Sequence, residues 1–125
     1  RSSTESRARS VRILKSILKR RISIFMFPEG SFNQTHGPLK EFYDGAFRIA
    51  IETQTPIKPL LFLDSYDRMR YEYFFSITPG RSRTVFLEEV SVEGLTVSQT
   101  QELKKRVYDI MEKKLIAYNA SWIRK

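Results

Sequence analysis

The chain contains no cysteine, so disulfide bonds, thiolate catalysis and cysteine-based metal sites are excluded. It has no apolar run near the roughly 20 residues that a membrane-spanning helix needs, so we expect any membrane contact of these residues to be peripheral. Histidine occurs once, at position 36. The content of 41% hydrophobic and 29% charged residues is typical of a globular protein, and the length suffices for one hydrophobic core. We therefore predict a single domain over residues 1–125.

Positive charge is concentrated at the amino-terminal end. Residues 1–21 carry a net charge of +7, and the remaining 104 residues carry only +1. Helical spacing over residues 4–20 places one apolar face among the cations, formed by Val11, Leu14, Ile17 and Leu18. Three interpretations are open: a helix packed on the sheet, attraction to an anionic membrane, or nucleic-acid binding. We expect packing on the sheet, with membrane attraction as an addition. Nucleic acid is not expected as a partner, since no helix-turn-helix, RNP or zinc signature is present.

A β-branched and aromatic run over residues 22–27 predicts a strand buried on both faces. Pro28 cannot donate a ladder hydrogen bond, so the strand should end there. Glu29 and the N–H groups of Gly30 and Ser31 would then lie at the carboxyl end of a strand, where open α/β sheets bind ligands. A carboxylate there can orient a hydroxyl, and a glycine lets the backbone approach a phosphate. Two alternatives remain open: a glutamate that binds loop N–H groups, and a plain turn glycine.

The rest of the chain predicts further helices and strands. We expect helices over residues 45–53, begun by Asp44, and from a capping box at Ser98 and Gln101 to about Asn119; strands are expected over 57–63, 71–78 and 83–92. The order predicts an α/β fold with a mixed, mostly parallel sheet flanked by helices.

Three sequence blocks resemble the glycerolipid acyltransferases, the family of 1-acylglycerol-3-phosphate acyltransferase. Residues 27–31 (Phe-Pro-Glu-Gly-Ser) resemble the block F-P-E-G-T-R-S, residues 42–50 resemble F-K-x-G-A-F-x-x-A, and residues 55–60 resemble V-P-I-V-P-V. Arg1 resembles the end of an I-D-R block. The order and spacing of these blocks over residues 1–63 make the resemblance specific, and it implies part of a glycerol-phosphate-acyltransferase-like domain.

The resemblance implies a role in phospholipid biosynthesis. A fatty acyl group would pass from acyl-CoA or acyl carrier protein to a lysophospholipid such as 1-acylglycerol-3-phosphate (lysophosphatidic acid), without a metal or other cofactor. The chain would lie peripherally at the cytoplasmic face of a membrane. The substrate-binding residues implied are Glu29, Gly30 and Ser31, with Pro56 and Pro59 near the acyl chain; Arg1 and Lys40 are added to the predicted substrate-binding residues for their charge.

The catalytic H-x-x-x-x-D block of that family lies upstream of all three blocks. His36 and Glu41 have a similar spacing, but residues 33–38 are turn formers and predict an exposed loop, which offers no rigid mount for a base. We therefore predict that His36 is not catalytic. The chain is expected to be the carboxyl-terminal part of a larger enzyme, inactive by itself.

Two aromatic residues stand where the family usually has cations. Phe32 replaces an arginine and Tyr43 a lysine, and neither can grip a phosphate as a cation does. Lys40, Arg48 or Arg1 would have to supply the charge, or the acceptor is a lyso-lipid with another head group. The alternatives to an enzyme are a non-catalytic lipid- or partner-binding domain descended from one and, less expected, a basic nucleic-acid-binding module.

Overall fold

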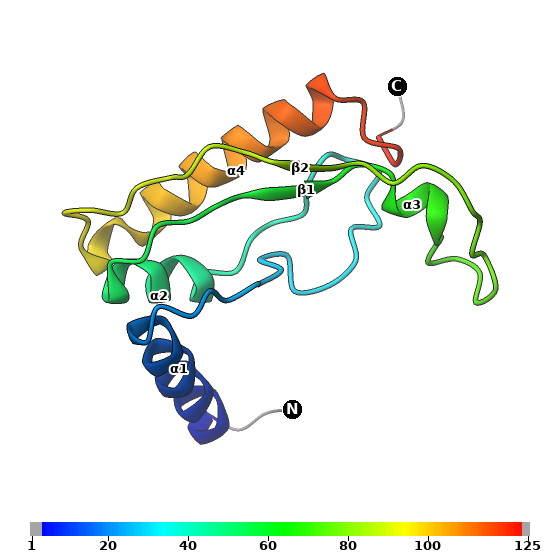
Figure 1. Ribbon diagram of the computed structural model, residues 1–125. Helices are drawn as coiled ribbons and strands as arrows, with labels where there is room; N and C mark the ends of the chain where they lie inside the picture. The colour runs from blue at the N-terminus through cyan, green and yellow to red at the C-terminus, as the bar shows by residue number, and fades with distance from the viewer. Residues whose placement is uncertain (1–3, 124–125) are drawn as a thin grey trace.

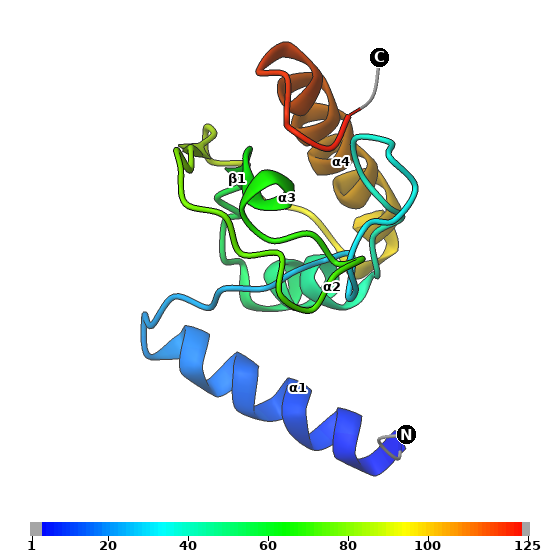
Figure 2. The same ribbon diagram turned by 90° about the vertical axis from the view of Figure 1, so that its right-hand side faces the viewer.

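The computed structural model describes residues 4–123, in which helices surround a short strand pair (Figures 1 and 2). The order of the elements is α1 (Thr4–Lys19), α2 (Gly45–Thr53), β1 (Leu60–Phe62), α3 (Ser65–Arg68), β2 (Thr84–Phe86), the 3₁₀-helix η1 (Val97–Gln99) and α4 (Thr100–Ala117).

The two strands run antiparallel, with Leu61 opposite Val85. An isolated bridge between Ile57 and Val90 extends their pairing. The mixture of helices and strands agrees with an α/β class. The prediction of a mostly parallel sheet does not hold for residues 4–123, because their paired strands are antiparallel.

The prediction of a buried strand over residues 22–27 is wrong for the structure. The segment is not paired with any described strand, and Ile22, Phe25 and Phe27 are exposed. The ring of Phe25 lies 6.3 Å from that of Phe62, so the segment passes beside β1. Residues of high β-propensity form a strand only where another strand is available to pair with them, because contacts between neighbouring strands stabilise a sheet.

The other predicted strands are shorter than expected. Within residues 57–63 only β1 and the bridge at Ile57 pair, and within 83–92 only β2 and the bridge at Val90. Residues 71–78 form no strand. There, the Ser76 hydroxyl accepts a hydrogen bond from the Arg70 N–H and donates one to the Arg70 carbonyl, and these bonds close a loop.

Helix α1 matches the predicted helix to within one residue at its end, but it does not pack on the sheet. None of its described residues is buried, and its neighbour is α2, where Lys15 forms an ion pair with Glu52. Its apolar face is therefore only partly covered. None of the helices in the described part of the chain is long and apolar enough to cross a membrane.

Helices α2 and α4 each place three residues in the hydrophobic core. Both begin differently from expectation: the Asp44 carboxylate does not cap α2, and the capping box before α4 is formed by Thr96 and Gln99, not by Ser98 and Gln101. The core also includes Leu61 of β1 and residues of the segments that follow β1 and β2. Its largest fully buried side chains are Phe47, Leu63, Leu103, Leu115 and Val92.

Candidate functional site

The candidate site is formed by two chain segments that lie side by side, residues 28–31 and 40–43. The Tyr43 N–H donates to the Pro28 carbonyl at 2.8 Å, and the Lys40 N–H donates to Glu29 Oε2 at 2.8 Å. The Lys40 ammonium group donates to Ser31 Oγ at 2.5 Å. The structure thus brings together four of the predicted substrate-binding residues: Glu29, Gly30, Ser31 and Lys40.

Glu29 has one oxygen engaged and one available. Oε2 holds the loop through Lys40, which is the backbone-binding role left open by the sequence. Oε1 accepts no hydrogen bond from the described residues and is not sealed from solvent. Burial raises the pKa of the Glu29 carboxyl, and the hydrogen bond and charge of Lys40 act in the opposite direction. The available oxygen can therefore accept a hydrogen bond from a ligand hydroxyl.

Gly30 has a positive φ of 66°, which favours glycine. A Cβ at this position would lie 2.6 Å from Tyr43 Cε2. The close approach that Gly30 permits is therefore to the Tyr43 ring, as in a turn glycine packed against an aromatic side chain.

A hollow of about 300 Å³ adjoins this loop and is lined by Lys40, Glu41, Phe42, Tyr43, Asp44 and Lys104. Lys104 reaches it from α4 and forms an ion pair with Asp44 at 2.7 Å. Two ammonium groups, of Lys40 and Lys104, thus border a hollow beside the Glu29 loop. The carboxylates of Glu41 and Asp44 border the hollow as well, so the charges of its lining balance.

The predicted acyl-pocket residues do not line the hollow beside the loop. Pro56 is exposed, and Pro59 is buried with its carbonyl accepting from the Leu87 N–H. Within residues 4–123, no hydrogen bond or ion pair joins the stretch 56–59 to Glu29 or Lys40. Arg1 lies outside the described residues.

Comparison with known proteins identifies the family of the chain. The family model described as Acyltransferase matches residues 1–63, which is half of the chain. The chain belongs to the acyltransferase family. Its sequence is 31% identical over 98 residues to 1-acyl-sn-glycerol-3-phosphate acyltransferase alpha of Mus musculus, covering 76% of this chain and 33% of that protein.

Bacterial relatives show the same similarity. The 1-acyl-sn-glycerol-3-phosphate acyltransferase of Haemophilus influenzae is 30% identical over 94 residues, 75% of this chain and 38% of that protein. The enzyme of the same name from Escherichia coli is 30% identical over 112 residues, 90% of this chain and 44% of that protein. The chain spans about a third of the length of the first curated relatives it matches. No solved structure matches it.

The single histidine of this acyltransferase chain lies in the loop predicted for it. His36 is half-buried, has a φ of 58°, and its ring lies 6.3 Å from the Tyr66 ring. Within the described residues, no carboxylate accepts a hydrogen bond from its imidazole, and no group of three or more His, Asp and Glu side chains could hold a metal ion. That His36 is not catalytic stays a prediction.

Sequence reasoning missed Lys104 and Trp122. The Trp122 indole N–H donates to the carbonyls of Gly37 and Pro38, which ties the carboxyl-terminal segment to the loop that leads to Lys40. Both residues lie more than 60 positions from the candidate loop, and no local signal in the sequence marks them.

Proposed function

We propose that the protein containing this chain transfers a fatty acyl group from acyl-CoA or acyl carrier protein to the free hydroxyl of a lysophospholipid such as 1-acylglycerol-3-phosphate. The main support is Glu29, whose loop is fixed through Oε2 while Oε1 remains available, in a chain that belongs to the acyltransferase family. The curated relatives named above are 1-acyl-sn-glycerol-3-phosphate acyltransferases.

In this proposal, Glu29 Oε1 orients the acceptor by accepting a hydrogen bond from its free hydroxyl until the base takes that proton. A bond to a charged acceptor is stronger than one between neutral groups, so a carboxylate is suited to holding a hydroxyl in one direction. The Lys40 N–H keeps that carboxylate in place. Position and orientation of the reacting hydroxyl are the contribution of this loop to the rate.

The phosphate of the acceptor would lie in the hollow beside the loop. Lys40 and Lys104 replace the charge that Phe32 and Tyr43 do not provide. Each ammonium group has three donors, so Lys104 can keep its ion pair with Asp44 and still bind a phosphate oxygen. Pro56 and Pro59 are proposed to lie near the acyl chain of a bound substrate.

The reaction itself would be a direct transfer. The acceptor oxygen attacks the thioester carbonyl carbon and forms the new C–O ester bond, and the C–S bond breaks. The base takes the proton of the hydroxyl and passes it to the leaving thiolate, which departs as a thiol. The base that takes this proton is proposed to be a histidine outside the 125 residues, since His36 lies in a loop and, in the part of the chain that the structure describes, donates no hydrogen bond to a carboxylate. No metal or further cofactor takes part. The region is proposed to act peripherally at the cytoplasmic face of a membrane.

The test is a substrate panel with the complete protein. Lysophosphatidate, lysophosphatidylglycerol and lysophosphatidylcholine are each supplied with acyl-CoA or acyl carrier protein, and both the diacyl lipid and the released thiol are measured. We expect equal amounts of diacyl product and thiol, with lysophosphatidate the preferred acceptor. A folded complete protein that acylates none of these acceptors with either donor would overturn the proposal, and would favour a non-catalytic lipid-binding domain.

A further inference from the structure

Residues 70–78, here called the aromatic loop, carry a consecutive group of exposed apolar side chains. Phe74 and Phe75 are each 91% exposed, Ile77 is 76% exposed and Tyr73 is 67% exposed. Single exposed apolar residues are common on protein surfaces, but a contiguous group of this size indicates a surface that binds something apolar.

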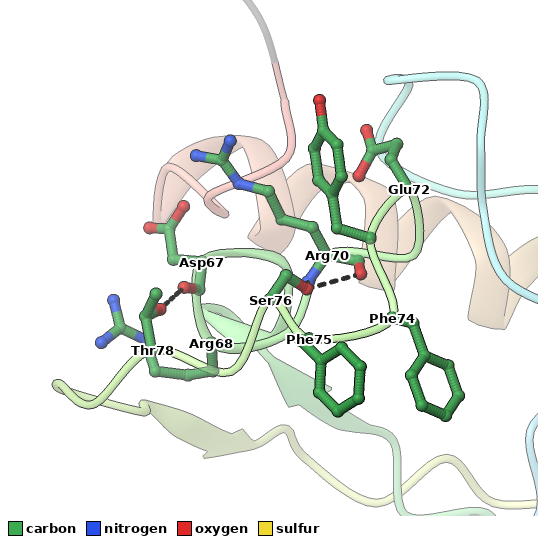
Figure 3. Close-up of a pocket in the computed structure, with 9 residues that line it drawn as sticks. Asp67, Arg68, Arg70, Glu72, Phe74, Phe75, Ser76 and Thr78 are labelled. Atoms are coloured by element: carbon green, nitrogen blue, oxygen red, sulfur yellow. Dashed lines mark hydrogen bonds between the residues drawn. The ribbon is translucent and has the colours of Figure 1, made fainter.

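The loop is held by hydrogen bonds at its base, so its tip is presented in a defined way. Ser76 bonds both the N–H and the carbonyl of Arg70 at 2.8 Å, and the Thr78 N–H donates to the Arg68 carbonyl at 2.9 Å. The Phe74 and Phe75 rings contact each other edge to face, with centroids 4.9 Å apart. Figure 3 shows both rings pointing to the same side, away from the Ser76–Arg70 closure.

Charged side chains line a hollow beside these rings. The hollow, of about 910 Å³, is lined by Arg68 and Arg70 and by the carboxylates of Asp67 and Glu72 (Figure 3). Arg68 donates to the Pro79 carbonyl at 2.6 Å while its Nε has no hydrogen-bond partner among the described residues. The Arg70 guanidinium lies 5.6 Å from the Tyr66 ring centroid. Guanidinium groups beside exposed rings can meet a surface with anionic head groups above an apolar interior.

The charge of the rest of the molecule is complementary to such a surface. The chain carries +8, and +7 of it lies in residues 1–21, most of which form α1. In Figures 1 and 2, α4 lies above the strand pair and α1 lies below it, and the aromatic loop descends from the end of the strands towards the α1 side. The loop and the basic helix can therefore approach one surface together.

We propose that the aromatic loop inserts Phe74 and Phe75 into the interfacial layer of an anionic lipid bilayer, with Arg68 and Arg70 at the level of the head groups. This inference rests on the proposed function, because a lipid acyltransferase meets its acceptor at such a surface. The loop adds an apolar contact to the general electrostatic attraction of α1 and sets which side of the molecule faces the lipid.

Vesicle binding of the chain tests this directly. Phosphatidylcholine vesicles with and without phosphatidylglycerol are sedimented with the chain and with the variants Phe74→Ser, Phe75→Ser and Ile116→Ser. Ile116 is also exposed but belongs to α4 on the other side of the strand pair, and serves as the matched control. We expect binding to anionic vesicles that each Phe→Ser change weakens by ~10-fold, from the apolar area removed, and that Ile116→Ser leaves unchanged.

A second measurement locates the loop. Because the chain has no cysteine, Phe75→Cys introduces a single thiol for a polarity-sensitive fluorophore. Its emission should shift to the blue when anionic vesicles are added. Wild-type affinity of the Phe→Ser variants, no binding of the wild-type chain, or no emission shift would each overturn the inference. So would a label on the complete protein already shielded without lipid, since another part of a polypeptide would then cover the loop.

Failure of this inference and of the proposed function are distinguishable. Acyl transfer to dispersed, short-chain lysophosphatidate reports the reaction without a bilayer. Transfer without vesicle binding by the loop refutes the insertion alone, and loop-dependent binding without transfer refutes the proposed function alone.

Discussion

The Asp64–Arg83 pair joins the end of β1 to the start of β2, and replacing Asp64 by asparagine should destabilise the fold. Asp64 is only 6% exposed. Its carboxylate accepts hydrogen bonds from Arg83 Nη2 at 2.7 Å, Arg83 Nε at 2.9 Å and the Arg83 N–H at 2.8 Å. The hydrogen bonds of Arg83 lower the pKa of the Asp64 carboxyl from 3.8 to about 2.

The magnitude follows from that pKa. The lowering of the Asp64 pKa from 3.8 to about 2 corresponds, at about 1.4 kcal/mol per pH unit, to about 2.5 kcal/mol of preferential stabilisation of the carboxylate in the folded state. Arg83 has a side chain that is 33% exposed, so water partly solvates its charge once the partner is lost. We therefore expect Asp64→Asn to lower the free energy of unfolding by about 2 kcal/mol at neutral pH.

The assay is urea unfolding followed by the fluorescence of Trp122, the single tryptophan of the chain. Asp67→Asn is the matched control, because Asp67 is an exposed neighbouring carboxylate, and it should change stability by less than about 0.5 kcal/mol. Asp64 has a lower pKa in the folded state than in the unfolded state. Its contribution is therefore complete above pH 3.8 and is lost as the pH falls towards about 2.

The stability difference between wild type and Asp64→Asn isolates this group from the other carboxylates. It should shrink over that pH interval. A difference at neutral pH no larger than that of Asp67→Asn, or one that does not shrink in acid, would refute the reasoning.

Three further predictions concern the candidate loop, α1 and the reaction. Gly30→Ala should cost about 1 kcal/mol in urea unfolding, because its φ of 66° is unfavourable for other residues; an unchanged midpoint would contradict this. Glu52→Gln should speed tryptic cleavage within α1 without changing the unfolding of the core, because its ion pair with Lys15 helps to hold a helix that has no buried residue; an unchanged cleavage rate would show that other contacts hold α1. The 125-residue chain by itself should release no thiol from acyl-CoA and lysophosphatidate, and measurable acyl transfer would show that the base lies within it.

Helices could be predicted from the sequence because their signals are local. The apolar spacing in α2 and α4 identified Phe47 and Leu103 as core residues, and both are buried. The paired segments were predicted less well, because a strand depends on a partner elsewhere. Residues 22–27 have a strand-like composition but no described partner, and they are exposed.

Residues of the candidate site could be predicted only where a local sequence block marks them. Family-like blocks pointed to Glu29 and Ser31, and Lys40 was considered because of its charge. The hydrogen bond between Glu29 and the Lys40 N–H depends on the path of the intervening loop, which the sequence does not specify. Lys104 reaches the hollow across 60 positions, and Trp122 holds the loop across 85, so only the tertiary fold could place them.

The central claim is that Glu29 binds the acceptor, and its most direct test is kcat/KM for lysophosphatidate in the complete protein carrying Glu29→Gln. Glutamine keeps an oxygen that accepts the Lys40 N–H, so the loop should remain folded while the charge is lost. Glu88→Gln is the control, because this exposed glutamate carries the same charge and lies outside the lining of the hollow and the candidate loop. We predict a loss of about 10- to 100-fold for Glu29→Gln, the range expected for a hydrogen bond to a charged group, and little change for Glu88→Gln. Equal values for the two variants would contradict the claim.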